Sequence, residues 1–199
     1  MLKPYFEEGL IEAGCDEAGR GCLAGPVFAA AVILPPDFNH PKLNDSKKLT
    51  AKQREYLRSL ILENAVRTSV QSLSNQEIDR VNILNASILA MHKALSTLGT
   101  ERIDLILVDG NRFKKFGSIK HQCIVKGDSI YTAIAAASIL AKTERDEYMK
   151  KLHEEYPQYG WNINKGYPTL KHREAIKNYG ITPYHRTTFK LKDDQLKIF

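Results

Sequence analysis

Four acidic residues adjoin apolar segments of the chain, where a carboxylate would be costly without a partner. Asp16 and Glu17 follow the run GLIEAGC, Asp109 ends LILVD, and Asp128 follows HQCIVKG. Such runs predict buried strands, and strand ends in an open α/β sheet line the ligand crevice. Carboxylates gathered there repel one another unless a cation lies between them, and Mg²⁺ or Mn²⁺ prefers oxygen ligands. These four residues are therefore candidate metal ligands.

The same acids also allow ordinary structural roles. Asp16 and Glu17 are neighbours, so a regular strand would point them to opposite faces. A turn at Ala18-Gly19 would let Glu17 swing back to the cavity of Asp16. A D-E pair that ends a strand can instead be a solvated turn, and Asp109 can belong to an ordinary VDG turn. Asp128 can be a helix N-cap. The spacing alone leaves both explanations open.

The elements that would position the acids follow from periodicity and caps. Thr50 with Gln53, and Ser74 with Glu77, are typical of capping boxes. The first predicts a helix through LTAKQREYLRSLILEN, and the second predicts one continuous helix over 75–98. Further helices are expected in SIYTAIAAASILAKTERDEYMKKLHEEY and over about 169–180, and strands in GLIEAGC, GPVFAAAVILPP, AVRTSVQSLS, RIDLILVDG and HQCIVKGD. This order predicts an α/β protein with one mixed sheet flanked by helices.

Bulk composition narrows the class of protein. The 199 residues carry 29 Lys and Arg against 23 Asp and Glu, a net charge of +6 that suits a polyanionic partner. Three cysteines without a C-x-x-C pair disfavour a disulfide framework and a zinc site. The start, MLKPYFEEGL, lacks the apolar core of a signal peptide, and no apolar run is long enough to cross a bilayer. We expect a cytoplasmic monomer that does not bind membranes.

Several longer strings together resemble one family. DEAGRG followed by LAGPV, then NDSKKLT, VDGN, KGDSIYTAIAAASILAKTERD and GYPTLKHREAI…HRTTF, are similar to the motifs of ribonuclease HII, the type 2 ribonuclease H. The resemblance implies a ribonuclease H fold, with a five-stranded mixed sheet, flanking helices and a C-terminal helical extension. Residues 1–199 would form a single catalytic domain, in which roughly 160–199 contact the substrate. The implied cofactor is Mn²⁺ or Mg²⁺.

The resemblance also implies an activity and a set of site residues. The activity is endonucleolytic hydrolysis of the RNA strand of RNA–DNA hybrids, including nicking 5′ of ribonucleotides embedded in DNA, with 3′-hydroxyl and 5′-phosphate ends. The four acids match the family's catalytic metal ligands. The turn Gly19-Arg20-Gly21 matches the segment that senses the ribose 2′-hydroxyl, the group that distinguishes RNA from DNA. Tyr167 matches the tyrosine that stacks beside the next deoxyribose.

Basic residues near these motifs are candidate phosphate contacts. Lys47 of NDSKKLT is expected to contact the substrate backbone, and Lys48 is left open. Lys142 and Arg145 lie one helical turn apart and could touch phosphates, although Arg145 could instead pair with an acid such as Asp146. His172 is expected to be structural.

Two other functions and one partner complete the expectations. The chain could be a hybrid-binding protein without catalysis, although all four acids are present, or a ribonuclease HIII-like paralogue, for which few residues precede Asp16. The last five residues, QLKIF, resemble the peptide by which bacterial repair proteins bind the sliding clamp. They could equally fold back onto the domain itself.

Overall fold

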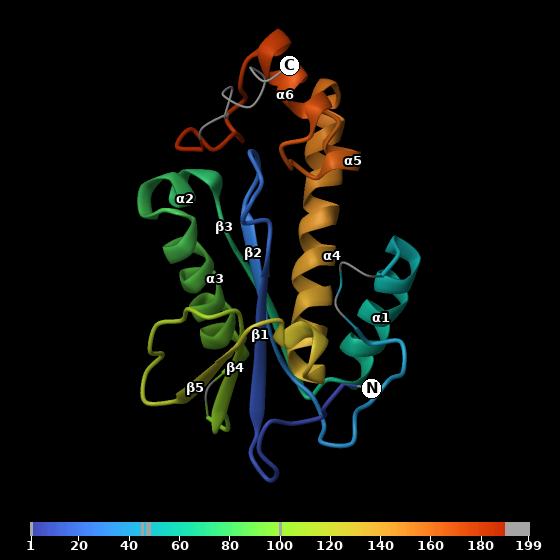
Figure 1. The fold of residues 1–199 in the computed structure, drawn as a ribbon, viewed down its shortest axis with the longest axis vertical. Coiled ribbons are helices and arrows are strands. Elements are labelled where there is room, and N and C mark those ends of the chain that lie inside the picture. Colours follow the sequence, from blue (N-terminus) through green and yellow to red (C-terminus); the bar gives the residue numbers. More distant parts are fainter. Residues whose placement is uncertain (1, 45, 47–48, 100, 190–199) are drawn as a thin grey trace, which may run out of the picture.

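A five-stranded mixed sheet lies between two layers of helices in the computed structural model, which describes residues 2–44, 46, 49–99 and 101–189 (Figure 1). The strands run in the spatial order β3-β2-β1-β4-β5. Their bounds are β1 Glu12–Ala18, β2 Val27–Ile33, β3 Arg67–Leu73, β4 Leu105–Asp109 and β5 Lys120–Ile124. β1 pairs antiparallel with β2 and parallel with β4, so the predicted mixed sheet is confirmed.

The helices cover both faces of this sheet. They are α1 Ala51–Asn64, α2 Asn75–Val81, α3 Ile83–Leu98, α4 Thr132–Glu155, α5 Trp161–Asn164 and α6 Leu170–Tyr179, with short 3-10 turns η1 Gly127–Ser129 and η2 Pro157–Tyr159. α3 packs on β2 and β3, whereas α4 packs on β1 and β2 from the other face and has α1 beside it. α5 and α6 lie near the C-terminal end of α4, beyond one end of the sheet (Figure 1).

The alanine-rich first half of α4 lets this helix lie unusually close to β1. A Cβ atom at Gly14 would collide with the backbone of Ala133 and Ile134. Ala136 and Ala137 are fully buried in the same layer. Close approach of a helix to a strand needs small side chains, because larger ones would hold the two backbones apart. This packing brings the middle of α4 beside the end of β1.

Local sequence signals account for most helix starts. Thr50 accepts a hydrogen bond from the Gln53 amide at 3.3 Å, and Ser74 accepts one from the Glu77 amide at 3.2 Å. The reciprocal side-chain bonds are also formed, so both predicted capping boxes are confirmed. The helix expected over about 169–180 is also present, as α6 with Thr169 at its N-cap.

The single helix expected over 75–98 is wrong. Asn82 interrupts it with a φ of 65°, in a region that favours glycine and tolerates asparagine. The Asn82 side chain then accepts a hydrogen bond from the Asn85 amide at 3.1 Å and starts α3 afresh. The apolar periodicity continues across this break, which is why it predicts one helix where the structure has two.

Candidate active site

β1 and β4 place two of the acids side by side. The parallel pairing of these strands runs to Cys15 and Val108, so Asp16 and Asp109 are the next residue on each strand. Asp16 is 4% exposed, and the Ser138 side chain of α4 hydrogen-bonds its carboxylate. Side chains in register on parallel strands point to the same face. Asp16 and Asp109 therefore both belong to the α4 face of the sheet.

Glu17 reaches the same cavity by a different route from the one expected. β1 stays regular through Ala18, because Glu17 and Ala18 still pair with Ala29 and Phe28 of β2, and the turn at Gly19 comes too late to redirect Glu17. Glu17 therefore points to the α3 face, opposite to Asp16. It lines cavities on both sides, since β4 ends at Asp109 and leaves the edge of β1 open there. The early end of β4, rather than a turn in β1, makes Glu17 accessible from the Asp16 side.

One cavity of about 420 Å³ collects most of the predicted site residues. Its lining includes three acids, the glycine turn and the tyrosine: Asp16, Glu17, Asp109, Gly19, Arg20, Gly21 and Tyr167. Ser46, Arg54, Ser138 and Lys142 line it as well. Lys47 lies outside the described residues. Segments far apart in the chain thus meet at one end of the sheet.

Asp128 does not line this cavity. It lies in η1 and is buried, and the adjoining Gly127 amide donates to Asp109 Oδ1 at 2.7 Å. The N-cap of α4 is Tyr131, so Asp128 is not the cap of that helix. Asp128 is therefore connected to the other acids through its neighbour Gly127, whose amide bonds the Asp109 carboxylate.

The acids form an electrostatically strained group. The pKa of Asp16 is raised well above its usual value, first by burial and then by the negative charges of Glu17 and Asp109. Glu17 is in an ion pair with Arg20 at 3.1 Å. Within the described parts of the chain, no three His, Cys, Asp or Glu side chains stand close enough to be a ready metal-ligand set. The carboxylate oxygens nevertheless suit a hard divalent cation, which would relieve their repulsion.

The two glycines of the turn differ in what the fold demands of them. Gly19 has a φ of +97°, and a Cβ atom there would collide with the Arg145 guanidinium. Gly21 has no such φ, and a Cβ atom there would meet only Tyr167 Cε1, at 4.0 Å. The fold therefore requires glycine at position 19 but not at position 21.

The two candidate phosphate contacts on α4, Lys142 and Arg145, both have partners within the protein. Arg145 is 1% exposed and donates to the backbone carbonyls of Pro26, Ala24 and Lys165, so its N–H groups are used there and not on Asp146. Arg145 is buried because the segment that follows α4 covers this face of the helix. Lys142, by contrast, lines the cavity and bonds Asp146 at 2.6 Å.

His172 is structural, as expected. It is fully buried, accepts from Trp161 Nε1 at 3.0 Å through Nε2, and so can donate through Nδ1 to the Tyr167 carbonyl at 2.9 Å. His185 lies beside it, with Nδ1 2.9 Å from the Thr182 amide that donates to it. Both rings therefore act as neutral imidazoles, and His172 holds the backbone of Tyr167 in place.

Ser46, Arg54 and Ser138 are cavity residues that the sequence motifs did not single out as a group. Ser46 Oγ and Ser138 Oγ are 2.9 Å apart, so the loop before α1 reaches the residue that bonds Asp16. Arg54 donates to the Ser46 and Leu49 carbonyls at 3.0 and 2.6 Å. A serine in the alanine run AAASILAK was a usable signal for Ser138, because buried hydroxyls need partners.

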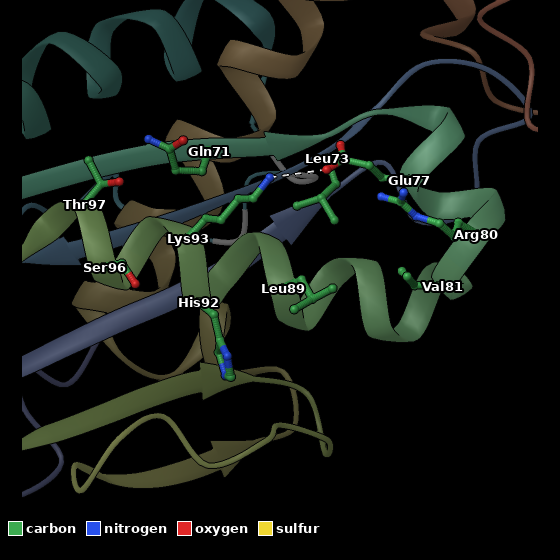
Figure 2. Close-up of a pocket in the computed structure, with 10 residues that line it drawn as sticks. All are labelled: Gln71, Leu73, Glu77, Arg80, Val81, Leu89, His92, Lys93, Ser96 and Thr97. Atoms are coloured by element: carbon green, nitrogen blue, oxygen red, sulfur yellow. Dashed lines mark hydrogen bonds and ion pairs between the residues drawn. The ribbon is translucent and has the colours of Figure 1, made fainter.

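A separate cavity of about 370 Å³ lies between β3 and helices α2 and α3 (Figure 2). An ion pair of 3.4 Å between Lys93 and Glu77 lies at this cavity, and Leu73, Val81 and Leu89 supply apolar lining. None of the predicted site residues lines it. No helix in the described residues is both long and apolar enough to span a membrane.

The sheet order and the helices on its two faces are those of the ribonuclease H class of proteins. Solved structures support the fold: the ribonuclease H2 of Pyrococcus horikoshii has a TM-score of 0.75 and 29% identity, covering 91% of this chain and 94% of that one. The RNase HII in a PCNA:RNase HII complex from Archaeoglobus fulgidus has a TM-score of 0.77 and 27% identity, covering 92% and 96%.

Sequence comparison then identifies the family. Residues 13–192 match the family model described as ribonuclease HII. Ribonuclease HII of Bacteroides fragilis is 61% identical over 100% of this chain and 99% of its own length, and that of Cytophaga hutchinsonii is 57% identical over 100% and 98%. The chain belongs to the ribonuclease HII family. It is a divalent-metal-dependent endonuclease that cleaves RNA in RNA–DNA hybrids and at ribonucleotides embedded in DNA, and not a paralogue of the HIII type or an inactive binding protein.

Proposed function

We propose that the cavity of Asp16, Glu17 and Asp109 is the catalytic centre, and that it cuts on the 5′ side of a ribonucleotide to leave 3′-hydroxyl and 5′-phosphate ends. One observation carries this proposal. Three carboxylates from two adjacent strands share a single cavity with a glycine turn and a partly exposed tyrosine. A centre that must both hydrolyse a phosphodiester and recognise a sugar needs these two kinds of group together.

Asp16, Glu17, Asp109 and Asp128 would hold two divalent cations, Mg²⁺ or Mn²⁺. Bound there, such cations supply an activated water and stabilise the leaving oxygen of an in-line displacement. Asp16 is the buried anchor of the group, oriented by Ser138 and by the Glu17 amide, which donates to Asp16 Oδ1 at 2.6 Å. Glu17 would exchange its bond to Arg20 for the cation. Asp128 would complete the set from the η1 side.

The glycine turn and Tyr167 would recognise the substrate. The backbone of Gly19-Arg20-Gly21 lines the cavity, and open space at Gly21 gives a ribose room to approach the chain. Arg20, whose side chain is half exposed, would bond a phosphate. Tyr167, which is 39% exposed, would stack its ring beside the deoxyribose that follows, and Lys47 would contact the substrate backbone. Because Tyr167 belongs to the segment from about residue 160 onward, this segment would be the substrate-contacting extension of a single catalytic domain.

Metal-dependent nicking tests this assignment. The substrate is a DNA duplex with one ribonucleotide, with the all-DNA duplex as the blank, and Mg²⁺ or Mn²⁺ is titrated in both. Asp16→Asn should abolish nicking and weaken Mn²⁺ binding in calorimetry, since an amide is a poor ligand for a hard cation. Asp37→Asn, an exposed acid outside the cavity, is the matched control. Wild-type nicking by Asp16→Asn would contradict the assignment.

We further propose that the C-terminal QLKIF binds a sliding clamp in the cytoplasm. The tail lies outside the described residues, so support comes from its sequence and from the archaeal relative solved as a PCNA:RNase HII complex. Its apolar side chains would enter a groove on the partner, as short peptides do. Titration with a bacterial sliding clamp should show micromolar binding that disappears when residues 195–199 are deleted, with nicking of naked DNA unaffected. Binding that survives the deletion, or none in either protein, would refute this proposal.

A further inference from the structure

Two arginines with almost no solvent contact lie directly behind the glycine turn. Arg145 of α4 is 1% exposed, and Arg186, near the end of the described chain, is 3% exposed. Neither forms an ion pair with any residue that the structure describes. A buried guanidinium is costly unless its N–H groups are satisfied. Both of these arginines are satisfied by backbone carbonyls instead of carboxylates.

Arg186 bonds the backbone both at the glycine turn and at Gly25, where the chain returns toward β2. Its Nη2 donates to the Gly19 carbonyl at 2.7 Å, and its Nη1 donates to the Arg20 carbonyl at 2.8 Å. Its Nε donates to the Gly25 carbonyl at 3.0 Å, shortly before β2 begins. Burial lowers the pKa of Arg186 to about 10, which leaves the guanidinium charged at neutral pH. One side chain therefore joins the start and the end of the loop of residues 19–25, which contains the glycine turn.

Arg145 connects the same loop to the segment of Tyr167. Its Nε donates to the Pro26 carbonyl at 3.0 Å, whereas its Nη1 donates to the Lys165 carbonyl at 2.8 Å. The Arg145 guanidinium carbon also lies 5.9 Å from the centre of the Tyr167 ring. The Gly166 carbonyl accepts from the Leu23 amide at 2.8 Å and strengthens the same connection. The turn and the tyrosine are thus parts of one hydrogen-bonded unit.

The geometry points to a specificity function: we propose that Arg145 and Arg186 are positioning residues that set the separation between the Gly19–Gly21 turn and Tyr167. A guanidinium is a rigid planar fork with five donors, so it can hold several carbonyls at fixed spacing. Lysine keeps the charge but is a point donor on a flexible stem. The inference rests on the proposed recognition of the ribose by the turn and of the next deoxyribose by Tyr167.

A fixed separation matters most for a single ribonucleotide. In DNA with one ribonucleotide, only one position puts a ribose at the turn and a deoxyribose at Tyr167. A continuous hybrid offers many ribonucleotides, and at most of them Tyr167 meets another ribose. Loss of alignment should therefore reduce cutting of the single-ribonucleotide substrate more than cutting of the hybrid.

The test compares kcat/KM on both substrates for Arg186→Lys and for Tyr167→Ala, alone and combined. Arg186→Lys should lower kcat/KM at least tenfold more on the single ribonucleotide than on the hybrid. The double variant should lose little more selectivity than the more affected single variant, because both changes break one unit. Tyr159→Phe is the matched control: it removes a 2.9 Å bond to the Gly180 carbonyl in the same C-terminal layer without touching the turn. This control should lower the melting temperature but keep the substrate ratio.

Equal losses on the two substrates, or selectivity losses that add fully in the double variant, would overturn the positioning role. If Arg186→Lys does not fold, Arg145→Lys gives the same comparison through the other half of the unit. Gly21→Ala and Tyr167→Ala test the underlying recognition separately. If neither of them changes the substrate ratio, the proposed recognition is wrong; if they change it and the arginine variants do not, only the positioning role is wrong.

Discussion

Replacing Gly21 by alanine separates substrate recognition from fold stability, because the structure makes opposite demands at the two glycines of the turn. At Gly21 the added methyl would lie 4.0 Å from Tyr167 Cε1, an ordinary contact, and the backbone is outside the left-handed region. Alanine in a compatible conformation stabilises a protein by about 0.4–1 kcal/mol. In a chain of this size that is a melting-temperature rise of roughly 1–4 °C.

Activity should respond in the opposite direction. The methyl of Gly21→Ala would occupy the space through which a ribose approaches the backbone, and a lost or unsatisfied hydrogen bond there costs about 1–3 kcal/mol. At about 1.4 kcal/mol for each factor of ten, kcat/KM on a single embedded ribonucleotide should fall roughly five- to a hundredfold. The fold should be at least as stable as that of the wild type while this activity is lost.

Gly19→Ala is the matched comparison. It forces alanine to a φ of +97° and against the Arg145 guanidinium, so it should cost at least about 1–2 kcal/mol of stability. Differential scanning calorimetry and steady-state nicking of a single-ribonucleotide duplex measure the two effects. A Gly21→Ala protein that nicks at the wild-type rate would refute the idea that the ribose approaches the chain at this residue. A lowered melting temperature for Gly21→Ala would show that the fold itself requires glycine at position 21, and would refute the view that this glycine serves only substrate recognition.

Three further predictions concern the acids, the tyrosine and the buried histidines. Asp109→Asn should keep the fold and lose nearly all cleavage in Mg²⁺, and near wild-type cleavage would exclude Asp109 as a metal ligand. Its melting temperature should stay level or rise, because the carboxylate repulsion with Asp16 is relieved. Tyr167→Ala should lower cutting at a lone ribonucleotide about ten- to hundredfold, from a stacking contribution of ~1–3 kcal/mol, and should affect a continuous hybrid less; equal losses would mean a general packing or binding role. Burial, then the neighbouring His172, lowers the pKa of His185 to about 4. The unfolded state therefore binds this proton first as pH falls, so the contribution of His185 to stability should decline from about pH 6.5 to pH 4, and His185→Gln should flatten that part of the decline in pH-dependent calorimetry.

The sequence by itself determined the elements whose signals are local. Capping boxes at Thr50 and Ser74 need only residues three positions apart, so they mark the starts of α1 and α2 without any knowledge of packing. The strand-like runs that end at Asp16 and Asp109 likewise follow from short apolar stretches. The break at Asn82 is local too, but apolar periodicity continues through it and hides it.

Only the tertiary structure decided which side chains share a space and which are removed from solvent. Glu17 faces away from Asp16 on β1, and it reaches the common cavity because a different strand, β4, stops at Asp109. Arg145 has the sequence context of an exposed helical arginine, yet residues from the loop after β1 and from the segment after α4 supply the carbonyls that bury it. The contact with Pro26 joins residues 119 positions apart, and side-chain type and spacing along the chain carry no record of where distant backbone carbonyls will lie.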